Sequence, residues 1–160
     1  MSHPSLGLPP RDLSAGDPAS AAAIRSGGAR LRARAMQAAL DVDPTMAERH
    51  SNLARAALLA DLEAFQDKLE VAVASGDPRA MATFADLVAV RYRKRKVSMD
   101  DVITLCEGLR RAGAAVVEPT AAPSIDAAID EAITVFRWHR RLAGDARKRH
   151  PLLGFIYKGA

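Results

Sequence analysis

Apolar residues recur at intervals of three and four along much of the chain, and this spacing predicts amphipathic α-helices. The first strong segment covers residues 44–74 and opens with Asp43 as a cap and Pro44 in the first turn. The pattern fits either one helix or two helices with a bend near Ser51 and Asn52. Its predicted buried stripe consists of Leu58, Leu62, Phe65, Leu69 and Ala72.

A clear boundary follows at residues 75–78, which read Ser-Gly-Asp-Pro. The glycine can end one helix in a left-handed conformation, and the aspartate and proline can cap and open the next. The sequence therefore predicts a helix over 78–95. Its predicted inner side carries Met81, Phe84, Leu87, Val88 and Tyr92.

Two more helices are predicted beyond this one. Ser98 and Asp101 have the spacing of a capping box, and the helix that follows Ser98 should stop before Pro119. The last helix should start at Ser124 and end at Gly144. The predicted inward residues of these two helices are Val102, Leu105, Cys106, Leu109 and Val116, then Ile125, Ile129, Ala132, Ile133 and Phe136.

The N-terminal region has a different composition. Residues 1–18 are rich in proline and glycine and poor in large apolar groups, so we predict a flexible tail there and a helical domain over 19–160. Within that domain Gly27 and Gly28 interrupt an Ala- and Arg-rich stretch, and a helix is expected over 29–40.

No alternating run of the kind typical of strands stands out, so the predicted fold class is all-α. We expect a single bundle or globin-like packing of four to five helices with a flexible N-terminal tail. Aromatic residues are only 4% of the chain, so the core must rely on aliphatic side chains and alanine. Its predicted centre is Leu62, Phe65, Phe84, Leu105, Leu109, Ile129 and Ile133.

Composition narrows the functional classes. The single cysteine, Cys106, cannot form an internal disulfide or a Cys-based zinc cluster, so a cytoplasmic protein is expected. No apolar run reaches the roughly 18 residues of a membrane span. The histidines have no metal-ligand spacing, and no cofactor is expected. Asp126 and Asp130, one turn apart, are better explained as acids favoured near a helix N-terminus than as acid–base catalysts. The chain is predicted not to be an enzyme.

Two basic clusters stand out against a net charge of only +4. The first, at 91–96, contains a candidate anion-binding set: Arg91, Arg93, Lys94, Arg95 and Lys96. The second spans 137–149 and interleaves arginines with Trp138, His139 and His150. Arginine and aromatic side chains together suit either a protein interface or stacking on nucleic acid bases. Both clusters are also compatible with solvated helix ends, where cations are favoured.

An apolar patch follows the second cluster. Because it lies outside any amphipathic helix, we expect it to be buried either against a partner, including a second copy of the chain, or against its own bundle; the partner is favoured. The candidate interface consists of Trp138, Arg141, Arg147, Lys148, Arg149, Leu152, Leu153, Phe155, Ile156 and Tyr157.

One long stretch resembles a known family. The run FADLVAVRYRKRKVSMDDVITLCEGLRRA at 84–112, followed by SIDAAIDEAITVFRWHRRL at 124–142, resembles the N-terminal sensor domain of the RsbR-type co-antagonists of bacterial stress signalling. The resemblance covers about residues 45–142. It implies a globin-like fold without haem, and dimerisation. Family members pass their signal to a C-terminal STAS domain, which has no counterpart in these 160 residues.

The sequence therefore predicts a non-catalytic regulatory, sensory or adaptor domain in bacterial signalling that acts by binding another protein, a second copy of itself in a homodimer included. The alternative is a nucleic-acid-binding protein that uses clusters 91–96 and 137–149.

Overall fold

The computed structural model describes residues 16–142, and these residues contain helices and no strands. The all-α fold class is therefore confirmed for this part of the chain. The elements are α1 (Pro18–Val42), α2 (Met46–Arg49), α3 (Asn52–Ser75), α4 (Arg79–Lys94), α5 (Met99–Ala114), the 3₁₀ turn η2 (Pro119–Ala121) and α6 (Ala122–Leu142). None of the helices in 16–142 has the length and apolar character needed to cross a bilayer.

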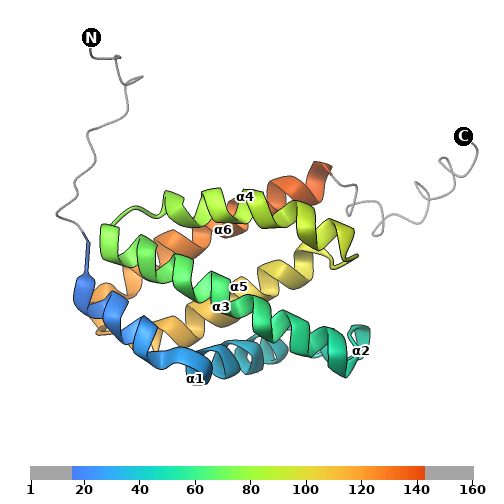
Figure 1. Cartoon of the computed structure of the whole chain (residues 1–160), viewed down its shortest axis with the longest axis horizontal. Helices are drawn as coiled ribbons and strands as arrows, with labels where there is room; N and C mark the ends of the chain where they lie inside the picture. Colours follow the sequence, from blue (N-terminus) through green and yellow to red (C-terminus); the bar gives the residue numbers. More distant parts are fainter. Residues whose placement is uncertain (1–15, 143–160) are drawn as a thin grey trace, which may run out of the picture.

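The five long helices form a bundle with two alternating directions. Figure 1 shows α1, α4 and α6 running one way along the bundle while α3 and α5 run back. Helix α1 packs mainly on α5 and α3, and α6 packs on α4 and α5. The C-terminal ends of α4 and α6 therefore lie at the same end of the molecule (Figure 1).

The predicted boundaries between α3, α4 and α5 are confirmed. Gly76 ends α3 with a φ of 65°, which is the left-handed conformation that glycine adopts without a steric penalty. The Ser98 hydroxyl accepts a hydrogen bond from the Asp101 amide at 3.0 Å and so caps α5. The side chain of Asp101 is instead buried against Arg49 and His50 of the α2 region, which ties that short helix to α5.

The segment that was predicted over 44–74 is two helices. Asp43 is the C-terminal cap residue of α1 rather than the start of a long helix, and its carboxylate accepts from the Thr45 amide at 3.1 Å. The helical conformation is interrupted again at Ser51, whose hydroxyl accepts a hydrogen bond from the Ala54 amide and so caps α3. Of the two interpretations of residues 44–74, two helices with a bend near Ser51 and Asn52 is therefore the correct one.

The N-terminal helix is longer than the predicted helix over 29–40. It begins at Pro18 because Asp17 caps it, accepting from the Ser20 amide at 3.0 Å, while the Asp17 amide donates to Val73 of α3. Gly28, at φ 46° and ψ −135°, has a non-helical conformation and kinks α1 into two helical segments, so the predicted interruption at Gly27 and Gly28 is confirmed. Residues 16–18 are thus part of the folded unit. The rest of the predicted tail, 1–15, lies outside the described residues.

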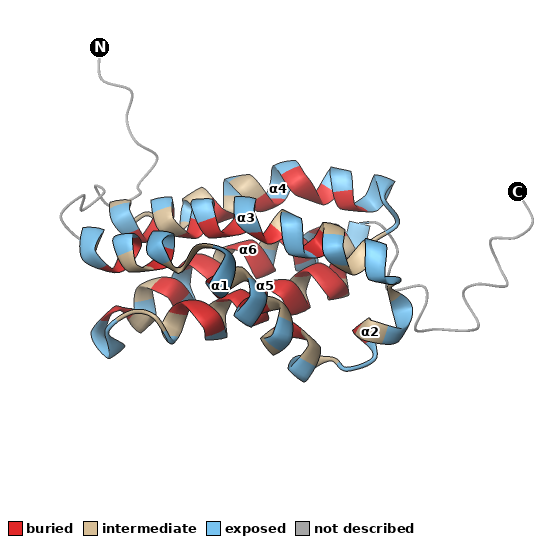
Figure 2. Ribbon diagram, turned by 60° about the horizontal axis from the view of Figure 1, so that its bottom comes forward, coloured by how far each residue is buried: buried red, intermediate tan, exposed pale blue. Residues whose placement is uncertain are grey.

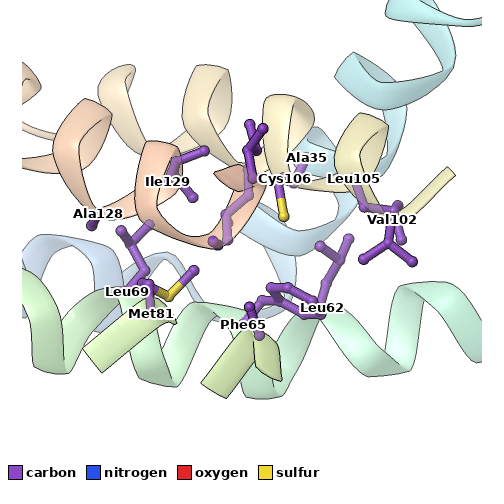
Figure 3. Packing of buried hydrophobic residues seen from close by; sticks show 14 of the residues in the cluster. Ala35, Leu62, Phe65, Leu69, Met81, Val102, Leu105, Cys106, Ala128 and Ile129 are labelled. Carbon is purple, nitrogen blue, oxygen red and sulfur yellow. The ribbon is translucent and has the colours of Figure 1, made fainter. Parts of the chain in front are cut away.

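The core fills the space between the helices, as the buried stripes in Figure 2 and the side chains in Figure 3 show. Every predicted central residue is fully buried except Phe84, which is half-buried. Phe84 lies at the edge of the core, where its ring meets that of Phe65 edge-on at 4.9 Å.

Leu87 was predicted to face inward and is instead 67% exposed. The small residues Ala85 and Ala89 occupy the buried positions that this prediction gave to larger side chains. Val116, also predicted inward, is only partly buried.

A candidate protein-interaction surface on helices α4 and α6

The first basic cluster forms the last turn of α4 and the two residues after it, and all five of its cations are exposed. Arg95 is paired with Asp61 of α3 at 2.6 Å and lies 5.4 Å from the centre of the Tyr92 ring. Tyr92 itself is buried, and this burial raises the pKa of its hydroxyl above the usual range. The other four cations have no ion pair within residues 16–142: Arg91, Arg93, Lys94 and Lys96.

The second cluster divides into residues that face outward and residues that face inward. Arg137, Trp138 and Arg141 are exposed at the end of α6. His139 is 5% exposed, and its Nε2 lies 2.7 Å from Asp86 of α4. Its Nδ1 is buried with no hydrogen-bond partner within the described chain. Arg140 bonds to Asp100 at the start of α5. The inward pair therefore fixes α6 to its neighbours, and only the outward residues can meet a partner.

The bond between His139 and Asp86 aligns the last turn of α6 with the middle of α4. Because Trp138 precedes His139, Leu87 follows Asp86 and the two helices run in the same direction, we expect the exposed side chains of Trp138 and Leu87 to lie on the same side of the bundle. Val90 shares the outer face of α4 with Leu87, three residues earlier, and Leu142 shares that of α6 with Trp138, four residues earlier.

These four apolar residues are unusually exposed for their size. Leu87 is 67% exposed, Val90 41%, Trp138 48% and Leu142 59%. Arg91 and Lys94 lie one turn beyond Leu87 and Val90, and Arg141 lies one turn beyond Trp138. We call this set of seven residues the α4–α6 surface. An apolar centre with an arginine-rich rim is the composition found in protein interfaces.

Exposed apolar residues on α3 do not form a comparable set. Leu53, Leu59 and Val71 follow each other at spacings of six and twelve residues. At about 1.5 Å of rise per residue these are separations of about 9 and 18 Å along the helix, and Leu59 projects about 120° away from the direction of the other two. They fit the isolated apolar groups that occur on most protein surfaces.

Two hollows in the described surface each lack either the size or the enclosure of a small-molecule site. A cleft between α3 and α4, lined by Phe65, Phe84 and Tyr92 among others, encloses about 100 Å³. Pockets that bury a small-molecule ligand usually measure about 300–1,000 Å³. A wider hollow of about 350 Å³ beside Leu53 and Lys96 is open to solvent. The α4–α6 surface is therefore the stronger candidate site.

Asp126, Asp130 and Cys106, which the sequence analysis also considered, have structural roles. Asp126 and Asp130 both pair with Arg110 of α5. Cys106 is fully buried in the core, as predicted, and this burial raises the pKa of its thiol above the usual range. Across residues 16–142, no three His, Cys, Asp or Glu side chains are grouped in a way that would hold a metal ion.

The sequence found part of this surface. Trp138 and Arg141 of the predicted interface and Arg91 and Lys94 of the predicted anion-binding set belong to it. Leu87, Val90 and Leu142 were missed. The remaining predicted interface residues lie outside the described residues: Arg147, Lys148, Arg149, Leu152, Leu153, Phe155, Ile156 and Tyr157.

Comparisons of the chain with protein-family models, with curated proteins and with solved structures return no match.

Proposed function

We propose that this chain is a non-catalytic regulatory or adaptor domain that acts by binding another protein through the α4–α6 surface. The observation that carries the proposal is the exposure of Leu87 and Val90 on α4 and of Trp138 and Leu142 on α6, two helices that pack against each other. Large apolar side chains gathered on one side of a bundle are costly to leave in water, and a partner that covers them removes this cost.

The composition of the surface supports a protein partner in particular. Tryptophan and arginine dominate the binding energy of protein interfaces because they bury large areas and make several contacts at once. Trp138 and Arg141 lie one turn apart on α6 and are both exposed. A sensory role in bacterial signalling and a cytoplasmic location belong to the same proposal, and the resemblance of residues 45–142 to RsbR-type sensor domains supports them.

The test is a pull-down with the immobilised full-length protein from a nuclease-treated lysate of cells that encode it. The variant Leu87→Ala/Trp138→Ala removes the apolar centre, and Leu53→Ala/Val71→Ala removes two exposed apolar groups elsewhere. We expect the first variant to lose a bound protein at least about tenfold, because truncating interface anchors weakens binding strongly. The second variant should retain it. Equal recovery by both variants would contradict the proposal.

A second function is supported by the four unpaired cations of the first basic cluster. Phosphate groups of nucleic acid would provide the missing negative charges, and the affinity would then fall steeply with salt as counterions are released. The apolar centre of the α4–α6 surface ranks this function below protein binding. Fluorescence anisotropy with a labelled DNA duplex and a labelled RNA strand should detect only weak binding at physiological salt. Nanomolar binding there would put nucleic acid first.

A further inference from the structure

We infer that the partner of the α4–α6 surface is an acidic amphipathic helix, with apolar residues on one face and Asp or Glu on its flanks. This inference rests on the proposed function and specifies the chemistry of the partner. Three occupants could cover the apolar centre: another protein, a second copy of this chain, or the chain's own segment after Leu142. The charges at the surface discriminate among them.

The charge of the rim is strongly one-sided. Arg91, Lys94 and Arg141 are exposed and have no ion pair within the described residues. One acid lies beside the surface: Asp86 accepts a hydrogen bond from His139, and its side chain is 65% exposed. A docked partner therefore meets three cations and one carboxylate, a net positive rim, and complementary charges on the partner would set both its orientation and its selectivity.

A second copy of the chain would carry the same cations to the same place. In a two-fold symmetric dimer the same patch faces itself, so the two copies would bring six positive charges close together against only the two Asp86 carboxylates. Like charges opposed across an interface disfavour that pairing. The surface is thus poorly suited to pair with itself.

The segment after Leu142 has the wrong charge as well. It contains Arg147, Lys148, Arg149 and Lys158, against the single acid Asp145. Its apolar residues at 152–157 suit the centre of the surface, but its cations would approach the cationic rim. An acidic partner has no such conflict.

A helix is the form of partner that fits the shape of the surface. Leu87 and Val90 lie one turn apart on α4, Trp138 and Leu142 lie one turn apart on α6, and the two helices run in the same direction and pack against each other. Helices that bind such faces use apolar anchors at spacings of three, four and seven residues. An acidic helix of about four turns, roughly 20 Å long, would span the three helical turns that the surface covers.

The experiment uses Trp138, the single tryptophan of the chain, as a reporter that already lies in the surface. The probes are three synthetic tryptophan-free peptides of 18 residues. One is an amphipathic helix of Leu and Glu, one replaces every Glu by Lys, and one has the Leu/Glu composition in scrambled order. Each is titrated into the full-length protein while Trp138 emission is followed.

We expect the Leu/Glu helix to shift the emission to shorter wavelength with saturation. The scrambled peptide should bind at least about tenfold more weakly because it lacks an apolar face, and the Leu/Lys helix should leave the emission unchanged. Arg91→Glu/Lys94→Glu should weaken the Leu/Glu helix by at least about tenfold. The matched control is Arg30→Glu/Arg34→Glu, which reverses two exposed unpaired cations on α1 and should change the affinity less than about twofold.

Several outcomes would overturn the inference. Binding of the Leu/Lys helix as tight as that of the Leu/Glu helix would do so, as would equal effects of the two charge reversals. Sedimentation showing a dimer that Leu87→Ala dissociates would identify a second copy as the occupant. A shift of Trp138 emission to longer wavelength in Leu152→Ser/Phe155→Ser, without any peptide, would identify the chain's own segment. If the pull-down succeeds while the Leu/Glu helix fails, the proposed function stands and only the acidic chemistry is wrong.

Discussion

The contact between α1 and α5 and the outer face of α4 and α6 differ in where large side chains lie. At the contact between α1 and α5 the backbones approach so closely that a methyl group on Gly108 would lie 2.1 Å from the Ala35 carbonyl oxygen. On the outer face of α4 and α6, large side chains point away from the bundle. Leu87 is 67% exposed and Trp138 48%, although each has a buried neighbour.

The difference separates residues that close the bundle from residues that remain available. Ala35, Ala39 and Gly108 are small because two helices meet there, so any larger group would force them apart. On α4, Ala85 and Ala89 fill the inner positions, and the larger apolar residues Leu87 and Val90 are left outside. A protein that needs only a stable bundle has no reason to place its larger side chains in water. This supports a binding role for the outer residues.

The largest effect should come from emptying the core on the closed side. Leu105 on α5 is fully buried, so Leu105→Ala should lower the free energy of unfolding by about 2–5 kcal/mol, through lost burial and the cavity left behind. Urea denaturation followed by circular dichroism measures this. Leu53→Ala, at a residue that is 82% exposed, is the matched control. A cost for Leu105→Ala close to that of the control would mean that the core assignment is wrong.

A substitution that overfills the close contact between α1 and α5 should lower the free energy of unfolding somewhat less. Gly108→Ala places a methyl group against backbone atoms of α1, and we expect destabilisation by about 1–3 kcal/mol, as for other overpacked sites. Gly113→Ala, on the same helix, meets side-chain atoms at 3.4–3.6 Å, which is ordinary contact distance. That control should be neutral or stabilising by about 0.5 kcal/mol because alanine favours helix. Thermal unfolding of both variants should show opposite or clearly unequal shifts.

A smaller effect of the opposite sign is expected where α4 ends. Lys96 adopts a φ of 59°, a left-handed conformation that strains residues with a Cβ. Lys96→Gly removes this strain at some cost in chain entropy, so we expect a gain of about 0.5–1 kcal/mol in urea denaturation. Lys94→Gly, at the last residue of α4, is the control and should destabilise by up to about 1 kcal/mol because glycine has a low helix propensity. If both variants lower the free energy of unfolding equally, the left-handed conformation of Lys96 is wrong.

The smallest effect should come from the open side. Leu87→Ala removes a side chain that is already 67% exposed, so the free energy of unfolding should change by less than about 0.5 kcal/mol. The same variant, combined with Trp138→Ala, should abolish partner capture. A loss of stability above about 1 kcal/mol would show that Leu87 supports the bundle, and it would undermine the binding role that we assign to it.

Part of the candidate site could be predicted because it depends on local composition. The basic clusters and Trp138 can be recognised from the sequence alone, since charge and residue type need no structure. Helical periodicity could not place Leu87, because Phe84, Leu87 and Val88 all suited an inner face until Ala85 and Ala89 were known to occupy it. Nor could it show that His139 and Arg140 turn inward, since Asp86 and Asp100 reach them from other helices.

By itself the sequence determined the all-α class, the boundaries at Gly76 and Ser98 and most of the core. These features depend on interactions within a few residues, namely apolar spacing, side-chain caps and glycine in a left-handed turn. The start of α1 at Pro18 depends on a local cap between Asp17 and Ser20 that the sequence analysis missed. Only the tertiary structure decided that this start docks on α3, where the Val73 carbonyl accepts a hydrogen bond from the Asp17 amide. It also decided which cations are paired within the described residues, and that α4 and α6, which both carry exposed apolar residues, pack side by side. Those outcomes depend on contacts between residues far apart in the chain, which local patterns do not encode.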